Sequence, residues 1–375
     1  MNINSAFDGG NIACLDCSQA SDIRLEIRND RESEFFQWFY FRLSRAAGRA
    51  CRLKIVNADQ AAYPKGWENY RAVASYDRED WFRVATDYDG KILTVRHRPE
   101  RDSVYYAYFA PYSMERHHDL LAHSLTSPRT ALESLGETLD RQQIDLLTIG
   151  EPAPEKRALW AIARQHPGET MAEWWMEGFL QRLLDGDDPV ARALLDKAVF
   201  HIVPNMNPDG SRRGHLRTNA AGINLNREWQ EPSQEKSPEV YWVRRRMEET
   251  GVGFCLDVHG DEAIPHNFIA GLEGVPSFSK RQGKLLGAYK EALLSANPDF
   301  QLSHGYPANK PGKANLKIGA NWIAERFGCL SMTLEMPFKD IADVAEQRQG
   351  WSPARCRAMG RSNLDAIHAV LGDLR

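Results

Sequence analysis

The stretch Ala158-Leu-Trp-Ala-Ile-Ala-Arg-Gln-His-Pro-Gly-Glu169 decides the fold class, because it joins a strand pattern to a helix pattern through a sharp turn. The apolar run 158–163 predicts a short buried strand, and the residues from Thr170 onward repeat apolar side chains at helical spacing. Pro167 fixes one backbone dihedral and Gly168 frees the next, so the pair predicts a turn. Strand-to-helix junctions of this kind are where α/β sheets place their sites.

Three residues around this turn and beyond it are predicted to bind one catalytic Zn²⁺ ion. His166 and Glu169 lie three positions apart on the turn, and His259 follows much later in the run Cys255-Leu-Asp-Val-His-Gly. Zinc accepts imidazole nitrogen and carboxylate oxygen, and its catalytic sites use three protein ligands and leave a fourth position to water. Taken alone, one His-x-x-Glu in a chain with 11 histidines is a weak signal, and the alternative is a solvated turn or a buried core histidine.

Composition bounds the class of protein. A chain of 375 residues exceeds the size at which single cores usually divide, so we expect two domains. Hydrophobic content of 42% and charge of 26% are typical of a globular protein. The net charge of −4 argues against a nucleic-acid partner bound by phosphate neutralisation.

The start of the chain and its cysteines predict a cytoplasmic protein without a membrane partner. The first ten residues have neither a basic start nor an apolar core, and no run approaches the roughly 20 apolar residues that span a bilayer. Of the six cysteines, Cys255 and Cys329 lie in apolar stretches and are expected to be reduced core residues. Cys14-Leu-Asp-Cys17 has no second Cys-x-x-Cys to complete a structural zinc site, which disfavours a role in chemistry.

Residues 1–112 are predicted to form an N-terminal antiparallel β-sandwich domain. Aromatic and β-branched segments alternate there with Gly, Asp and Asn turns. The expected strands are 23–27, 35–43, 81–85, 92–96 and 104–109. Their aromatic side chains are interpreted as the core of the sandwich in preference to a ligand-binding stripe.

Residues 113–375 are predicted to form an α/β catalytic domain, with a mixed or mostly parallel sheet flanked by helices. The expected strands are 144–149, 158–163, 198–203, 253–258 and 330–334. The expected helices lie near 127–142, 170–185, 237–249, 280–296 and 352–373. Between them, the segment Val203–Trp229 is dense in Asn, Arg and Gly, which suits either a substrate-recognition loop or a solvated loop with caps.

Taken together, these motifs resemble the zinc metallocarboxypeptidases, and specifically the cytosolic carboxypeptidase subfamily. The matching segments are His166-Pro-Gly-Glu169-Thr170, Asn207-Pro-Asp-Gly210, Asn226-Arg227, His259-Gly260 and Thr333-Leu-Glu335. The aromatic β module ahead of them resembles the N-terminal domain of that subfamily, so the resemblance covers nearly the whole chain. It implies a metallocarboxypeptidase fold and hydrolysis of the C-terminal residue of peptides or proteins.

The resemblance also implies roles for individual residues. The zinc ligands of the family fall on His166, Glu169 and His259. Its general base falls on Glu335, which would accept a proton from water and deliver it to the leaving amine. Its oxyanion-stabilising arginine falls on Arg217, which would face the carbonyl oxygen as negative charge develops there.

Two further residues would bind the substrate's terminal carboxylate. The family's carboxylate-binding pair falls on Asn226 and Arg227. Arginine suits this role because its planar fork makes two hydrogen bonds to a carboxylate, which lysine cannot copy. Such a contact would restrict cleavage to the end of a chain.

The chain departs from the family pattern at three places. Where many relatives carry an aspartate that orients a zinc-bound histidine, this chain has Asn224, whose amide oxygen can still accept the ring proton. The tyrosine that closes over substrate has two candidate positions, Lys313 and Tyr306. His259 is followed by Gly260-Asp261-Glu262, which changes the local polarity.

Lys310, Lys313 and Lys317 cluster on a loop that in the family helps to form the pocket for the departing residue. We therefore expect Lys313 and Lys317 to bind substrate and to favour a C-terminal glutamate or aspartate, as in deglutamylating members of the family. A solvated basic loop is the alternative.

Two other functions stay open on the sequence. A zinc amidohydrolase of the aspartoacylase or desuccinylase type uses a similar ligand set and a similar Asn-Arg pair. A non-catalytic binding protein with the same fold would have lost Glu335 or a zinc ligand, and all four are present.

Overall fold

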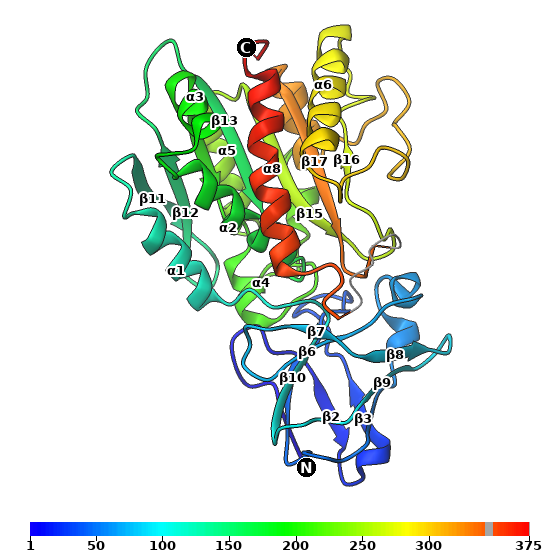
Figure 1. Cartoon of the computed structure of the whole chain (residues 1–375). Helices are drawn as coiled ribbons and strands as arrows, with labels where there is room; N and C mark the ends of the chain where they lie inside the picture. Colours follow the sequence, from blue (N-terminus) through cyan, green and yellow to red (C-terminus); the bar gives the residue numbers. More distant parts are fainter. Residues whose placement is uncertain (342–347, 375) are drawn as a thin grey trace.

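The computed structural model describes residues 1–341 and 348–374, which form a β module and a larger α/β unit. The N-terminus lies at the far end of the β module, and the C-terminus lies at the opposite end of the molecule (Figure 1). This arrangement matches the expected fold class.

The β module contains two five-stranded sheets with the orders β1-β4-β10-β6-β7 and β2-β3-β5-β9-β8. Its strands are β1 (Asn2–Asn4), β2 (Ala13–Asp16), β3 (Ile23–Glu26), β4 (Tyr40–Ser44), β5 (Cys51–Ile55), β6 (Val73–Ser75), β7 (Phe82–Arg83), β8 (Ala85–Tyr88), β9 (Leu93–His97) and β10 (Ser103–Ala107). Its 3-10 helices are η1 (Ala20–Asp22), η2 (Ala58–Gln60) and η3 (Pro64–Trp67). The strand pairs are antiparallel except β3 with β5, which run parallel.

Aromatic side chains form the core of the β module. Phe39, Trp67, Tyr70 and Tyr108 are buried, and the rings of Trp67 and Tyr70 each lie with their centroids 5.1 Å from that of Tyr108. Edge and tilted ring pairs at such distances stabilise a core beyond the area that they bury. The aromatic residues of this segment therefore act as core, as expected.

The α/β unit is built on a seven-stranded mixed sheet with the order β11-β12-β14-β13-β15-β17-β16. Its strands are β11 (Thr130–Glu137), β12 (Gln143–Ile149), β13 (Arg157–Ala163), β14 (Ala198–Val203), β15 (Phe254–Asp261), β16 (Phe268–Ala270) and β17 (Leu330–Pro337). The central strands β14, β13, β15 and β17 run parallel, and β11, β12 and β16 add antiparallel pairs at the edges. Because β13, β15 and β17 are parallel neighbours, their carboxyl ends meet at one edge of the sheet.

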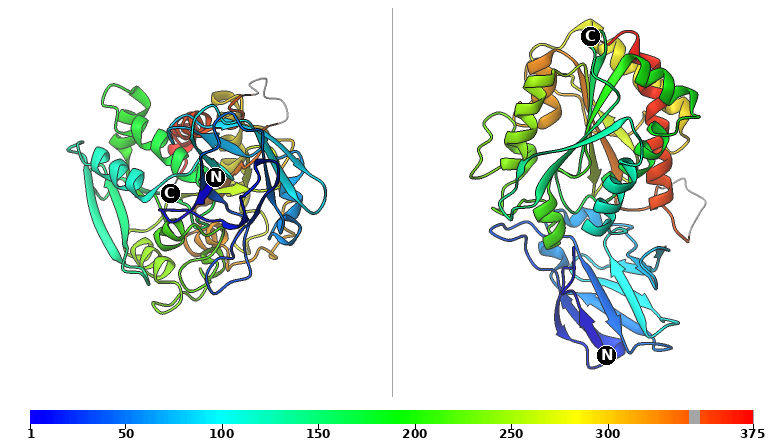
Figure 2. Two further views of the ribbon diagram at one scale, coloured as in Figure 1. Left: turned by 90° about the horizontal axis from the view of Figure 1, so that it is seen from below. Right: turned by 90° about the vertical axis from the view of Figure 1, so that its left-hand side faces the viewer.

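Helices cover both faces of this sheet (Figure 2, right). Within the described ranges they are α1 (Met114–Ser124), α2 (Met171–Leu183), α3 (Pro189–Lys197), α4 (Pro208–Arg213), α5 (Pro238–Thr250), α6 (Lys280–Ala296), α7 (Gly319–Phe327) and α8 (Pro353–Leu371), with the 3-10 helix η4 (Leu225–Arg227). On one face α2 and α6 pack against α8, and α5 and α7 lie on the other face (Figures 1 and 2). No helix in residues 1–341 or 348–374 is long and apolar enough to cross a membrane.

The helix predicted near 127–142 is wrong, because this segment forms the edge strand β11 and its turn into β12. Its residues include good helix formers, and Leu132, Leu135 and Leu139 repeat at helical spacing. As a strand it satisfies its backbone by pairing with β12, and local propensity yields to that pairing. The strand expected at 35–43 also begins later, at Tyr40.

The β module and the α/β unit are joined by buried polar and aromatic contacts. Arg83 of β7 is buried, lies 3.1 Å from the carboxylate of Asp340, and donates to the carbonyl oxygens of Phe338 (3.0 Å) and Trp351 (3.2 Å). The ring of Tyr108 stacks on that of Phe338 with centroids 4.4 Å apart. Phe338 and Asp340 follow β17 directly, so the module borders the carboxyl edge of the sheet.

Gly178 in α2 and Gly360 in α8 let these two helices approach closely, which generates a stability prediction. A Cβ at Gly178 would lie 2.1 Å from the carbonyl oxygen of Arg357, whereas one at Gly287, in α6, would meet nothing within 4 Å. Gly178→Ala is expected to lower the free energy of unfolding by about 1–3 kcal/mol, because backbone must move. Gly287→Ala should raise it by about 0.5–1 kcal/mol. Urea unfolding followed by circular dichroism measures both, and equal effects would contradict the packing described here.

Candidate metal centre

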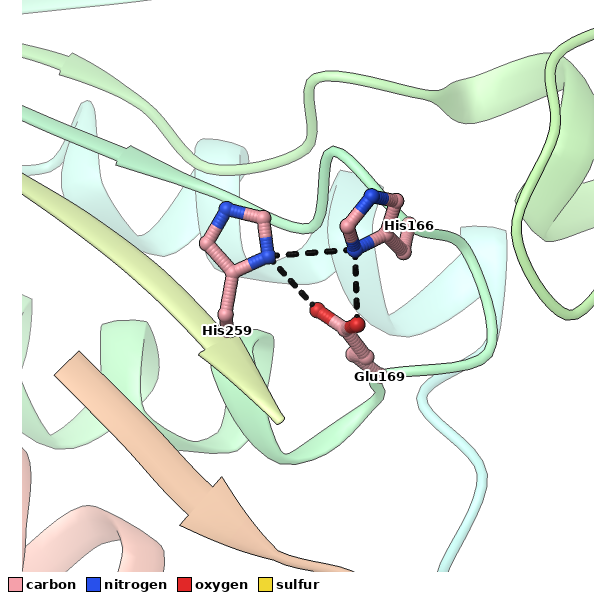
Figure 3. A group of neighbouring side chains, drawn as sticks. All are labelled: His166, Glu169 and His259. Atoms are coloured by element: carbon pink, nitrogen blue, oxygen red, sulfur yellow. Dashed lines mark hydrogen bonds and ion pairs between the residues drawn. The ribbon is translucent and has the colours of Figure 1, made fainter. Parts of the chain in front are cut away.

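The three predicted metal ligands converge at the carboxyl edge of the sheet (Figure 3). His166 and Glu169 lie on the turn between β13 and α2, and His259 lies near the end of β15. Glu169 Oε1 is 2.7 Å from His166 Nδ1, Glu169 Oε2 is 2.9 Å from His259 Nδ1, and the two Nδ1 atoms are 3.2 Å apart. All three side chains are buried, and their ligand atoms lie within 4.8 Å of one another.

Each imidazole is oriented by a partner on its other nitrogen. His166 Nε2 lies 3.0 Å from Asn224 Oδ1, and His259 Nε2 lies 3.0 Å from Asp257 Oδ1. Asn224 Oδ1 can accept a proton from His166 Nε2, the Asp257 carboxylate lies at ion-pair distance from His259 Nε2, and both Nδ1 atoms are directed toward the centre. The contact expected for Asn224 is therefore present.

This donor set fits a zinc ion. Two imidazole nitrogens and a carboxylate lie 2.7–3.2 Å from one another, which is a spacing that one shared cation could bridge. Imidazole nitrogen and carboxylate oxygen are the ligand types that zinc accepts. The negative charges of Asp257 and Glu169 outweigh the effect of burial and raise the pKa of His259 well above its usual range. The electrostatic environment therefore favours a positive charge at this position. Burial, with Arg217 nearby, lowers the pKa of His166 to about 4, so that this ring is neutral at pH 7 and can donate its lone pair.

Sequence reasoning missed Asp257, although a signal was available. Residues two apart on a strand share one face, so Asp257 and His259 of β15 had to lie on the same side. Gln165 donates to the second oxygen of Asp257 at 2.7 Å. The carboxylate is therefore fixed between the histidine and a buried amide.

The Asn207-Pro-Asp-Gly210 motif packs against the turn that contains His166 and Glu169. Asn207 caps α4 by accepting from the backbone of Gly210, and its amide donates to the carbonyl of Gln165 at 3.0 Å. A Cβ at Gly210 would lie 2.6 Å from Pro167. The motif thus acts as packing and capping for the turn, which resolves one part of the loop that the sequence left open.

The three predicted metal ligands line a cavity of about 590 Å³. Predicted residues in its lining are His166, Glu169, Arg217, Asn226, Arg227, His259 and Glu335. Others that line it are Tyr63 from the β module, Tyr306, Asp261, Glu262, Glu273 and Lys290. A separate cavity of about 660 Å³ against α1 and α2 contains none of the predicted residues.

Glu335 lies beside the metal-binding residues as a buried carboxyl group. It pairs in register with His259, on the neighbouring strand β15, and is 8% exposed. Its Oε2 atom has no hydrogen-bond partner among the described residues. Burial outweighs the attraction of His259 and raises the pKa of Glu335 well above its usual range. A carboxyl with a free oxygen and a raised pKa is suited to proton transfer.

Arg217, Arg227 and Asn226 supply the cationic and amide side chains of the cavity lining. The guanidinium carbon of Arg217 lies 5.6 Å from the ring centroid of Phe35 and 5.4 Å from that of Tyr63. Arg227 donates to the carbonyl of Asn226 at 2.6 Å, and burial, with Arg217 adding, lowers its pKa. Asn226 in turn accepts from the backbone of Gly319 at 2.8 Å.

Lys313 and Lys317 are not brought into this cavity. Both side chains are exposed, as is Lys310, and none of them belongs to the cavity lining. Counting positions along the loop could not detect this, because side-chain direction depends on the loop's path. The lysine that does line the cavity is Lys290, on α6.

Of the two candidates for the closing tyrosine position, Tyr306 lies at the cavity. Its hydroxyl donates to Asp261 Oδ2 at 2.5 Å, and its ring packs against Phe268 with centroids 4.9 Å apart. Glu262, which follows Asp261 in the sequence, is buried and lines the cavity. Burial raises the pKa of Glu262 to about 8, and the negative charge of Glu169 adds to this rise. Neither acid was assigned a role from the sequence.

The Asp257 contact generates a prediction about metal affinity. Asp257→Asn is expected to weaken zinc binding by about 10–100-fold, because the ring of His259 loses a charged acceptor. Competition with a chromophoric chelator measures the affinity. Asp145→Asn is the matched control, since Asp145 lies 3.4 Å from Nε2 of His117, away from the cavity. Equal zinc affinity in the two variants would contradict the assignment.

Two family models match the chain. Residues 3–109 match the cytosolic carboxypeptidase N-terminal domain, and residues 118–272 match the zinc carboxypeptidase domain.

Solved structures and a curated relative agree with these matches. The chain is 51% identical to a metallo-carboxypeptidase from Burkholderia cenocepacia, with a TM-score of 0.97 and 99% of each chain covered. It is 45% identical to a metallo-carboxypeptidase from Pseudomonas aeruginosa in complex with (2-guanidinoethylmercapto)succinic acid, with a TM-score of 0.97 and full coverage of both chains. It is 28% identical to mouse cytosolic carboxypeptidase 3 over 75% of its own length, and spans 31% of the mouse protein.

Proposed function

The chain belongs to the zinc carboxypeptidase family, and on this premise we propose that it hydrolyses the C-terminal peptide bond of peptides or proteins at one zinc ion. The observation that carries the proposal is a single cavity lined by the three candidate metal ligands, by the buried carboxyl group of Glu335 with its free oxygen, and by two arginines. We further propose that residues 1–112 and 113–375 are its two domains.

His166, Glu169 and His259 would hold the ion. A bound zinc ion supplies a water of lowered pKa and polarises a carbonyl group. Asn224 and Asp257, each 3.0 Å from an outer ring nitrogen, would hold the two imidazoles in the orientation that binding requires.

Glu335 accepts the proton of the attacking water and delivers it to the leaving amine. Its raised pKa supports the second step, since a carboxyl that holds a proton near neutral pH can also return it. Its Oε2 atom is available for the transfer because nothing in the described chain bonds it.

The two arginines bind different groups of the substrate. Arg217 donates to the carbonyl oxygen as charge develops, a contact worth about 2.7–4 kcal/mol in comparable sites. Arg227, with Asn226 beside it, binds the terminal carboxylate through a planar fork. Recognition of that carboxylate confines cleavage to the last residue of a chain.

Glu335→Gln tests the proposed base. The variant should lose about 100–10,000-fold in kcat and keep its zinc content, because the amide cannot accept the proton. Kinetics on a blocked dipeptide together with metal analysis measure this.

Glu239→Gln is the matched control for that test. Glu239 is a buried carboxyl outside the cavity whose pKa burial raises to about 8, so an amide resembles its protonated form. A Glu335→Gln enzyme as active as the parent would rule out the proposed base.

The finer proposal is a preference for C-terminal glutamate or aspartate. Its support now comes from Lys290, because the three loop lysines are exposed and outside the cavity lining. Arg217 and Arg227 are assigned to the carbonyl and the carboxylate, which leaves Lys290 for a side chain. Glu273 also lines the cavity and would favour a basic residue instead. The ligand of the Pseudomonas relative combines a guanidino group with succinic acid, and so is compatible with either preference.

Peptides ending in Glu, Leu or Lys distinguish these preferences. We expect the highest kcat/KM for Glu, and a loss of about tenfold or more for that substrate alone in Lys290→Met, because a charge-assisted contact is removed. Lys313→Met is the control and should match the parent. Release of Leu as fast as Glu, or faster, would exclude the acidic preference.

The alternatives from the sequence are not favoured by the family matches. The domain ahead of the catalytic unit matches that of cytosolic carboxypeptidases, which supports peptidase over small-substrate amidohydrolase activity. Turnover of N-acetylaspartate without peptide turnover would reverse this choice. We propose a cytoplasmic location, supported by relatives named cytosolic carboxypeptidases.

A further inference from the structure

We infer that the β module positions Arg217 in the cavity, through Asp30, Phe35 and Tyr63. The inference rests on the proposed role of Arg217 at the substrate carbonyl. Asp30, Phe35 and Tyr63 then act as positioning residues, and the β module forms part of the active site.

Asp30 binds the backbone on both sides of Arg217. Its Oδ1 accepts from the amide of Leu216 at 2.6 Å, and its Oδ2 accepts from the amides of Arg217 at 2.8 Å and Thr218 at 2.9 Å. The hydroxyl of Thr218 adds a fourth bond at 3.1 Å. One carboxylate from the β module therefore fixes three consecutive residues of the α/β unit.

The carboxylate is well placed to make these bonds strong. Asp30 is 1% exposed, so water does not compete for its oxygens. Hydrogen bonds to an ionised acceptor are roughly twice as strong as neutral ones. A second contact supports the same segment, since His215 Nε2 accepts from the amide of Arg31 at 3.0 Å and its Nδ1 lies 3.0 Å from the carbonyl oxygen of Thr218.

The side chain of Arg217 is held by the same module. Its guanidinium lies near the rings of Phe35 and Tyr63, and Tyr63 itself lines the cavity. A guanidinium within about 6 Å of an aromatic centroid is attracted to the ring. Backbone and side chain are thus both fixed by residues that precede β4 or lie between β5 and β6.

The same segment also contacts the metal-binding turn. The carbonyl oxygen of Leu216 accepts from the amide of Gly168 at 2.9 Å, and a Cβ on Gly168 would lie 2.9 Å from that oxygen. Asp30 therefore sets the position of Arg217 relative to the turn that contains His166 and Glu169. Distances in this part of the site depend on the module being in place.

Asp30→Asn in the full chain tests the inference. The amide loses the charge and can accept fewer of the backbone N–H groups, so kcat should fall about tenfold or more while KM and zinc content stay at parent values. Hydrogen exchange at residues 216–218 should accelerate. Asp89→Asn is the matched control, because Asp89 accepts from the amides of Lys91 and Ile92 on an exposed turn of the same module.

A double-mutant cycle separates positioning from general destabilisation. In an Arg217→Ala background, Asp30→Asn should cause no further loss of kcat, since Asp30 acts through Arg217. If Asp30→Asn does not fold, Tyr63→Leu replaces it, with Tyr63→Phe as the control that keeps the ring. Tyr63→Leu is expected to lower kcat, and Tyr63→Phe to retain it.

The outcomes separate this inference from the proposed function. Parent kcat in Asp30→Asn, or a loss that adds in full to that of Arg217→Ala, overturns the inference and leaves the peptidase proposal standing. If the parent hydrolyses no peptide, the proposed function fails. Exchange at 216–218 then still decides whether Asp30 holds the segment, and exchange equal to that of Asp89→Asn would overturn it.

Discussion

The site depends on one arrangement of charge, a buried carboxylate facing two imidazole lone pairs. Glu169 lies between His166 and His259 at hydrogen-bond distance, and an oxygen atom of Asn224 or Asp257 lies 3.0 Å from each outer nitrogen. Such a group is stable inside a protein only when a positive charge completes it. The donor types and their convergence therefore suit a bound cation.

The rest of the fold can be understood as support for that arrangement. Parallel pairing of β15 with β17 sets His259 opposite Glu335, so that the ligand and the proposed base share one level of the sheet. The turn after β13 brings Glu169 to the same edge. The β module contributes Tyr63 to the cavity lining and, through Asp30, contacts the segment that carries Arg217. Two hydrogen bonds, from Leu216 to Asp30 and from Gly168 to Leu216, thereby connect the β module to the turn that contains His166 and Glu169.

Several parts of this picture were predictable because they depend on local patterns. The strand 158–163, the turn at Pro167 and Gly168 and the helix over 280–296 follow from apolar spacing and turn chemistry, and α6 has these very bounds. Asp257 could have been found by strand alternation. The segment 127–142 was misassigned because its strand state depends on β12, a partner that local spacing does not reveal.

The sequence by itself determined the fold class, the convergence of a close ligand pair with a distant histidine, and the family whose motifs it carries. Only the tertiary structure decided which cations reach the cavity, since Lys290 lines it and Lys313 does not. It alone revealed that Asp30 holds the segment around Arg217, across 186 positions from Leu216. The reason is physical: spacing along a chain specifies which face of an element a residue occupies, but contacts between elements arise only when the sheet and the β module pack together.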